Sequence, residues 1–144
     1  MNSAKLLLSI LTITVLFILQ ACGGESSNEN NTAQNSQQET GLSEFELEHG
    51  IGPVNEVVEL GELDSDLAAE GKEVFEAKCT ACHRPNERYI GPPVDGMLDR
   101  RSPTYVMNMI MNPDEMTKKH PEAKKMLQEY LSPMPYQNVT VEEA

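Results

Sequence analysis

Two cysteines and a histidine at residues 79–83 form the segment of this 144-residue chain that is best suited to chemistry. The segment is Cys-Thr-Ala-Cys-His, so the two thiols lie three residues apart and an imidazole directly follows the second. Three chemistries use this spacing: a thiol redox pair, half of a zinc site, and the covalent attachment of a haem. The choice among them depends on the compartment of the protein and on the other ligands that the chain supplies.

The first 22 residues have the layout of an export signal. Lys5 gives a positive start, residues 6–19 are an unbroken run of apolar and hydroxyl side chains, and Leu-Gln-Ala-Cys follows at residues 19–22. The run is short for a membrane span and is typical of a secretory signal peptide. Its ending resembles the lipobox of bacterial lipoproteins, in which the cysteine, here Cys22, is acylated after cleavage. An ordinary signal peptide and an uncleaved membrane anchor are the alternatives.

Acylation of Cys22 would tether the protein without a membrane span, because a diacylglycerol and an amide-linked chain together are enough for stable anchoring. Residues 23–40 contain no Val, Ile, Leu or aromatic side chain, which predicts a disordered segment. We therefore expect a signal peptide at residues 1–21 and a lipid-anchored tether at residues 22–40. The folded part would face the periplasm from the bacterial cell envelope.

The number of cysteines decides among the three chemistries. The chain has three cysteines, and acylation of Cys22 leaves only Cys79 and Cys82. A redox CxxC pair belongs with a βαβ pattern, which this sequence lacks, and a zinc site needs further ligands nearby, whereas the other two histidines lie 34 and 37 residues from His83. In an exported chain CxxCH therefore indicates one haem c, with Cys79 and Cys82 bonded to its vinyl groups and His83 ligating the iron.

Helical patterns flank the CxxCH motif. Capping residues, prolines and apolar stripes predict helices from Asp64 or Ser65 to about Lys78, from Ser102 to Met111, and from Glu122 to Leu131. Pro113 is expected to stop the second helix, and Met116 is expected in a turn. No stretch alternates for long enough to predict a strand. We expect an all-α domain at residues 64–144 around one haem, preceded by an N-terminal arm at residues 41–63.

With these elements in place, the domain resembles the class I mono-haem cytochrome c family from about Asp64 to the last residue. Gly71, Phe75 and Cys79 match the spacing in the N-terminal helix of that family. Gly-Pro-Pro-Val at residues 91–94 resembles the family's Gly-Pro-x-Leu segment.

The resemblance implies roles for residues that follow the motif. The carbonyl of Pro92 would accept the Nδ1 proton of His83, which orients the ring and raises its basicity. Arg100 would face a haem propionate, and Arg101 is an equal candidate for that contact.

The resemblance also implies a second axial ligand from a Met-Pro loop. Met134 stands between two prolines, 51 residues after His83. The methionines of residues 107–111 lie on a predicted helix, where methionine usually fills a core. Met134 is therefore the expected distal ligand, and Met116 and His120 are the remaining alternatives.

The family ends with a helix that crosses the first helix near Gly71 and Phe75. Residues 139–144 resemble only the cap and first turn of that helix, so the final helix is expected to be truncated. Either the sequence is a fragment, or the arm at residues 41–61 covers the face that the helix would occupy.

The expected function is that of a membrane-tethered c-type cytochrome that carries single electrons in a bacterial respiratory chain. Both axial positions would be filled by protein, so no catalytic residue is expected. Residues 48–54 and 112–116 resemble small cytochromes that accompany nitrous oxide reductase, which implies a periplasmic terminal reductase of that kind as electron acceptor. The alternative is a five-coordinate haem c protein that binds a diatomic gas or reduces peroxide.

The charge of the chain bears on its partners. Cleavage before Cys22 would remove Lys5 and no acidic residue, leaving 10 basic and 23 acidic side chains and a formal charge of −13. Nucleic acid is excluded as a partner, because binding to phosphates needs clustered Lys and Arg. We expect redox protein partners that present a basic docking patch.

Overall fold

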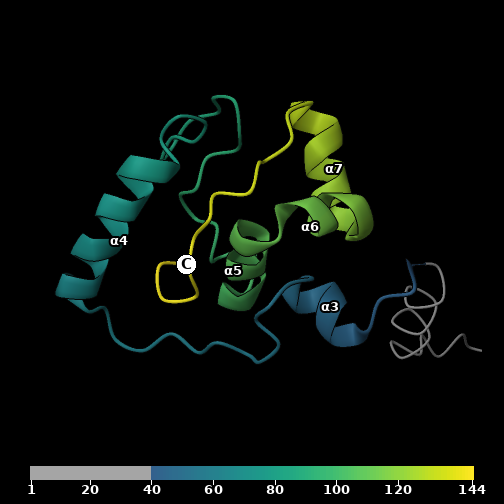
Figure 1. Ribbon diagram of the computed structural model, residues 1–144, viewed down its shortest axis with the longest axis horizontal. Coiled ribbons are helices and arrows are strands. Elements are labelled where there is room, and N and C mark those ends of the chain that lie inside the picture. Colours follow the sequence, from purple (N-terminus) through teal and green to yellow (C-terminus); the bar gives the residue numbers. More distant parts are fainter. Residues whose placement is uncertain (1–39) are drawn as a thin grey trace, which may run out of the picture. The chain divides into compact units, whose positions relative to one another are not determined.

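The computed structural model describes residues 40–144 (Figure 1). The signal peptide at residues 1–21, the acylated Cys22 and nearly all of the tether lie outside the described residues and stay predictions. The described part contains five helices and no strand, which confirms the all-α fold class. None of these helices is long and apolar enough to cross a bilayer.

Helix α4 (Ser65–Lys78) delivers the chain to the CxxCH motif. The Asp64 side chain caps it by accepting hydrogen bonds from the amides of Asp66 and Leu67, at 2.9 and 3.2 Å. At the other end the amide of Cys79 donates to the carbonyl of Phe75. The helix predicted before the motif is therefore confirmed, and it ends directly at the first cysteine.

Two further predicted helices are confirmed. Helix α5 (Pro103–Met111) begins after Ser102, whose hydroxyl accepts from the Tyr105 amide, and has proline in its first turn. Helix α7 (Pro121–Tyr130) begins one residue earlier than expected and also ends one residue earlier, because Leu131, which follows it, has the left-handed conformation.

Helix α6 (Pro113–Lys119) was not predicted, and the expectation of a turn around Met116 is wrong. Pro113 does end the preceding helix, but it also begins a new one, because its fixed φ suits the first helical position. Asp114 and Glu115 in the first turn pair with Lys118 and Lys119 in the last turn. Both pairs have the i,i+4 spacing that supports a short helix.

The N-terminal arm contains helix α3 (Glu44–His49), which carries a capping box between Ser43 and Glu46. Helix α3 packs against α5. The extended chain that follows α3 also binds α5, since the amide of Val54 donates to Asn108 Oδ1 at 3.0 Å and that of Val58 to Thr104 Oγ1 at 2.8 Å. The arm is therefore an ordered part of the fold, packed on the domain as expected.

The core lies between the arm and helices α5 to α7. Its buried apolar members are Leu42, Ile51, Tyr105, Met116 and Ala123, with Leu47 and Met109 packed against them. The arm supplies three of these residues, because Leu42, Leu47 and Ile51 all precede α4. The small core thus depends on a segment that lies outside the domain predicted from the sequence.

The arm does not cover the apolar face of α4. No residue of α4 is buried, Leu67 is 62% exposed, and a Cβ atom on Gly71 would meet nothing within 4 Å. The interpretation in which the arm replaces the final helix is therefore wrong. Residues 140–143 form a single turn capped by Thr140, whose hydroxyl accepts from the Glu143 amide at 3.3 Å, as expected for a helix start.

Candidate haem-binding site

The CxxCH motif forms one tight turn at the end of α4. The amides of Cys82 and His83 both donate to the carbonyl of Cys79, at 3.0 and 2.9 Å. This turn holds two half-buried thiols and the imidazole on a short piece of backbone. The three groups predicted to bind haem are therefore presented by a single local structure.

The surroundings of the motif disfavour the redox and zinc interpretations. Burial raises the pKa of the Cys79 thiol, against the smaller opposite effect of the Lys78 ammonium. Catalytic redox cysteines depend instead on a lowered pKa. Among residues 40–144, no cluster of three or more His, Cys, Asp and Glu side chains could hold a metal ion.

The imidazole of His83 is held in one orientation. Its Nδ1 lies 2.9 Å from the carbonyl oxygen of Pro92, which accepts the Nδ1 proton. The lone pair of the neutral ring is then on Nε2, which has no hydrogen-bond partner among the described residues. A fixed ring with a free Nε2 fits a proximal iron ligand, and the contact implied by the family resemblance is present.

Gly91 allows the backbone to approach this ring. A Cβ atom at Gly91 would lie 2.6 Å from His83 Cε1, closer than any real contact. The amide of Gly91 donates to the carbonyl of Cys82 at 2.8 Å, which closes the loop behind the imidazole. The residues present therefore fit a haem that is bonded to the motif and ligated by His83.

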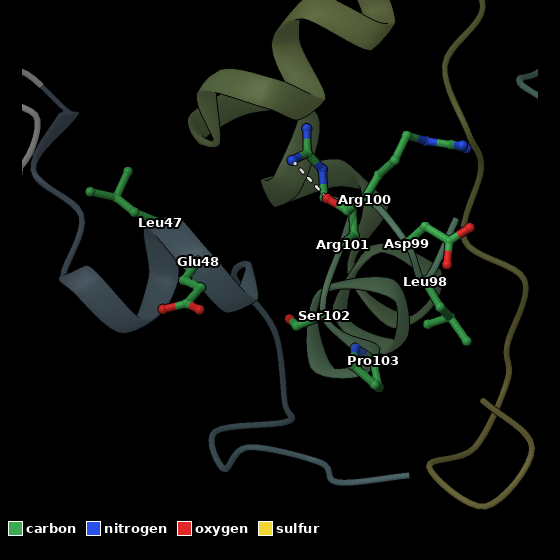
Figure 2. A pocket seen from close by; sticks show the side chains of 8 residues that line it. All are labelled: Leu47, Glu48, Leu98, Asp99, Arg100, Arg101, Ser102 and Pro103. Carbon is green, nitrogen blue, oxygen red and sulfur yellow. Dashed lines mark hydrogen bonds between the residues drawn. The ribbon is translucent and has the colours of Figure 1, made fainter. Parts of the chain in front are cut away.

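The two candidate propionate partners differ in what they already bind. Arg101 donates to Glu122 Oε2 at 2.8 Å and lies over the Tyr105 ring at 5.2 Å. Arg100 is exposed and donates only to the carbonyl of Asp95, at 3.3 Å, and has no carboxylate partner in the described part of the chain. Figure 2 shows the two side chains pointing in different directions. Arg100 is therefore the better candidate.

A solvent-open pocket of about 410 Å³ lies between α3 and the start of α5 (Figure 2). Its walls are Leu47 and Glu48 of α3 together with residues 98–103. None of the three CxxCH ligands lines it. The pocket is therefore a feature of the contact between the arm and the domain.

Both alternatives to Met134 as distal ligand are engaged elsewhere. Met116 is fully buried, and its sulfur accepts a hydrogen bond from the Ile51 amide at 3.1 Å. His120 uses both ring nitrogens, since Nε2–H donates to the Leu47 carbonyl and Nδ1 accepts from the Glu122 amide. The sulfur of Met134, by contrast, makes no hydrogen bond to any described residue. The structure therefore leaves Met134 as the strongest distal candidate.

Arg84, the residue directly after the motif, was not predicted to have a structural role. The guanidinium of Arg84 donates to the carbonyls of Thr80 and His83 and lies 4.1 Å from the centre of the Tyr89 ring. These contacts tie the start of the following loop to the CxxCH turn. An arginine followed five residues later by a tyrosine is not a recognised motif, so only the folded chain shows these contacts.

Comparisons with known proteins agree with this geometry. Residues 68–144 match the family described as Cytochrome c. The solved structure of cytochrome c from Rhodothermus marinus is 41% identical, covers 70% of this chain and 87% of its own, and superposes with a TM-score of 0.64.

Two engineered forms of the R. marinus protein, called Rma TDE, are also similar. One is 41% identical with a TM-score of 0.63, and the other, bound to a carbene intermediate, is 42% identical with a TM-score of 0.61. In each pair 68% of this chain and 85% of the other are covered. Comparison with curated proteins gives no significant match. By sequence and by structure, this chain belongs to the cytochrome c family, whose members bind a covalently attached haem c.

Proposed function

We propose that this protein is a single-electron carrier whose haem is bonded to Cys79 and Cys82 and ligated by His83 and Met134. The haem supplies the one-electron chemistry, with its iron alternating between the ferrous and ferric states. The observation that carries the proposal is the fixed His83 ring, whose Nδ1 is bound to the Pro92 carbonyl while Nε2 stays free.

Each residue of the site has a separate task. The two cysteines hold the haem covalently, so it is kept through every redox cycle. The Pro92 carbonyl orients His83 and raises its basicity. The neutral thioether of Met134 favours ferrous iron and a fairly high reduction potential. With His83 and Met134 both holding the iron, a substrate would have no open site there.

The partners follow from the charge of the surface. Between Glu56 and Glu76 the chain carries eight acidic side chains and one lysine, and the acidic side chains are exposed. A redox protein with a basic docking patch complements this surface, and such encounters become slower as salt increases. A periplasmic terminal reductase, such as nitrous oxide reductase, is the electron acceptor that we propose within a respiratory chain.

The proposed location rests on Leu-Gln-Ala-Cys at residues 19–22. A lipid on Cys22 would hold the protein at a membrane of the cell envelope, with the haem domain in the periplasm. A Cys22→Ala variant exported through a cleavable signal should keep its haem and leave the membrane fraction. Retention of that variant in the membrane would place the anchor elsewhere.

The decisive experiment replaces the distal ligand. Met134→Ala should keep the haem through extraction with acidified organic solvent, because the thioether bonds are untouched. It should lose the weak sulfur-to-ferric-iron absorption band, lower the reduction potential and bind carbon monoxide readily. Met116→Leu is the matched control, because it replaces a methionine whose sulfur already binds Ile51, and it should keep the band.

The wild-type protein distinguishes the carrier from the five-coordinate alternative. A His/Met haem binds carbon monoxide poorly, whereas an open haem binds it readily. An engineered relative is bound to a carbene intermediate, so a similar protein is able to hold a small reactive fragment. Rapid, tight binding of carbon monoxide to the wild type would contradict the proposed electron carrier. It would support the alternative function, gas binding or peroxide reduction.

A further inference from the structure

Arg88 connects two segments that are far apart in the sequence. It lies in the loop after the CxxCH motif and binds the end of α7, 41 residues away. Its Nη1 lies 3.0 Å from Glu129 Oε1, its Nη2 donates to the Glu129 carbonyl at 2.9 Å, and its guanidinium lies 4.0 Å from the centre of the Tyr130 ring. One side chain thus makes three different contacts.

The end of α7 needs such a partner. The last carbonyls of a helix have no partner within the helix, and the Glu129 carbonyl is one of them. Directly after α7, Leu131 has φ 53°, in the left-handed region that a residue with a side chain rarely adopts. The Leu131 side chain is 84% exposed and cannot hold this turn by burial. Met134 follows three residues later.

The loop that carries Arg88 is held close to His83, the proposed proximal ligand. Arg88 is five residues after His83, in a loop whose far end is closed by the hydrogen bond from the Gly91 amide to the Cys82 carbonyl. The neighbouring Tyr89 is held by the guanidinium of Arg84 and by its own amide, which donates to the Gly91 carbonyl at 3.2 Å. Arg88 therefore extends from a segment that is tied to the proximal ligand.

We propose that Arg88 is a clasp between the two sides of the haem site: a positioning residue that keeps the segment carrying Met134 closed over the iron. The proposal rests on the proposed function, because it requires His83 and Met134 as the axial ligands. Without the clasp, the left-handed turn at Leu131 keeps only the hydrogen bond from its own amide to the Leu127 carbonyl, at 2.9 Å, and the segment after α7 opens more often. Each opening would take the Met134 sulfur away from the iron that it is proposed to hold.

The three contacts act together. An exposed ion pair contributes little by itself, and the side chains of Arg88 and Glu129 are 54% and 57% exposed. A charge-assisted bond to a helix carbonyl and a stack on an aromatic ring add to it. Lysine offers a point charge without the planar fork, so Arg88→Lys should restore only part of the effect.

The experiment measures how often the distal position opens. The ferric, haem-loaded protein is mixed with saturating imidazole, and loss of the sulfur–iron band gives the rate at which Met134 leaves. Arg88→Gln should increase this rate roughly tenfold, which corresponds to about 1.4 kcal/mol. Glu129→Gln, which keeps the backbone contact, should increase it about twofold, and Arg88→Lys should fall between these two variants.

Lys118→Gln is the matched control, because within the described residues 40–144 the one ion pair of Lys118 is with Asp114 of the same helix, at 3.5 Å. In Lys118→Gln, imidazole should replace Met134 at the wild-type rate. High salt should increase this rate more in the wild type than in Arg88→Gln, because it screens the ion pair that only the wild type has. The clasp is overturned if Arg88→Gln exchanges like the wild type while the wild type has its sulfur–iron band, or if Lys118→Gln is equally fast.

Two further outcomes are also decisive. If Arg88→Gln does not fold, Arg88→Lys replaces it, and a wild-type rate in that variant overturns the clasp. If the wild type has no sulfur–iron band, the distal assignment of Met134 fails, and the clasp fails with it. If the wild type has the sulfur–iron band and the Arg88 variants exchange at its rate, the clasp is rejected and the assignment of Met134 is kept.

Discussion

Replacing Asn108 by alanine should detach the arm from α5. Asn108 is fully buried, and its side-chain amide makes three hydrogen bonds to the arm. Oδ1 accepts from the Val54 amide at 3.0 Å, and Nδ2 donates to the carbonyls of His49 and Val54 at 3.0 and 2.9 Å. Alanine makes none of these bonds and leaves three backbone groups of the arm without their partner.

The size of the effect follows from these contacts. At about 0.5–1.5 kcal/mol net for each bond, the three bonds together contribute about 2–4 kcal/mol. A small domain is stable by only about 5–15 kcal/mol, so the loss is a large fraction of the total. Asn86 is exposed in the loop after the motif and makes no side-chain hydrogen bond to the described residues. Asn86→Ala should therefore change the free energy of unfolding by less than about 0.5 kcal/mol.

Urea unfolding of the haem-loaded variants measures the free energies, and hydrogen exchange locates the loss. The Val54 amide should exchange much faster in Asn108→Ala than in the wild type, while amides of α4 change less. If Asn108→Ala unfolds within 0.5 kcal/mol of the wild type and Val54 stays protected, the arm is not held by these hydrogen bonds. The arm would then not be a stabilising part of the core.

Three other changes test separate parts of the structure. Gly91→Ala should reduce haem loading and lower the free energy of unfolding by about 1–3 kcal/mol, because its methyl group would collide with the His83 ring. An unchanged free energy of unfolding in urea would contradict that close approach. Gly71→Ala should stabilise the protein by about 0.5–1 kcal/mol, because the helical site is open; a loss in thermal unfolding would show that a segment packs there. Burial lowers the pKa of His120 below its ordinary 6.5, so the free energy of unfolding should decrease as pH falls below about 6.5, by at most about 1.4 kcal/mol per pH unit. His120→Asn keeps a capping side chain and should lose this slope in denaturant titrations from pH 5 to 8; an equal slope would assign it to another group.

Burial of the His120 ring is the main reason why acid should destabilise the folded state. The folded protein needs Nδ1 unprotonated to accept from the Glu122 amide, and Arg101 nearby adds a further cost to a charged ring. The unfolded chain takes up a proton near pH 6.5, while the folded chain does so only at lower pH. Acid therefore favours the unfolded state within this window, and the stabilisation is fully present above it.

The chemistry of this protein was determined by residues that are close together in the sequence. The CxxCH motif occupies five residues, and the turn that it forms needs only the backbone bonds to Cys79. Asp64 and Ser102 cap helices through amides two or three residues away. Such contacts depend on spacing along the chain, so the haem motif, the family and helices α4, α5 and α7 were predictable.

Other features depend on contacts between distant segments, for which spacing gives no information. Val54 of the arm is 54 residues before Asn108, its hydrogen-bond partner. No pattern in residues 41–63 indicates that partner. For the same reason the sequence left Arg100 and Arg101 equal, whereas in the folded chain Glu122 binds Arg101. The prediction of a turn at Met116 failed because proline ends one helix and begins the next with the same φ angle.

The distal side of the iron shows how these two kinds of information combine. The sequence by itself placed Met134 between two prolines and left Met116 and His120 as alternatives. Only the tertiary structure shows that these two side chains are hydrogen-bonded to the arm. The partner of Met116 is Ile51, 65 residues away, and that of His120 is Leu47, 73 residues away. A long-range hydrogen bond forms only once the chain has folded, so only the fold could count against Met116 and His120 as distal ligands. The motif that binds the haem, in contrast, was determined by local sequence.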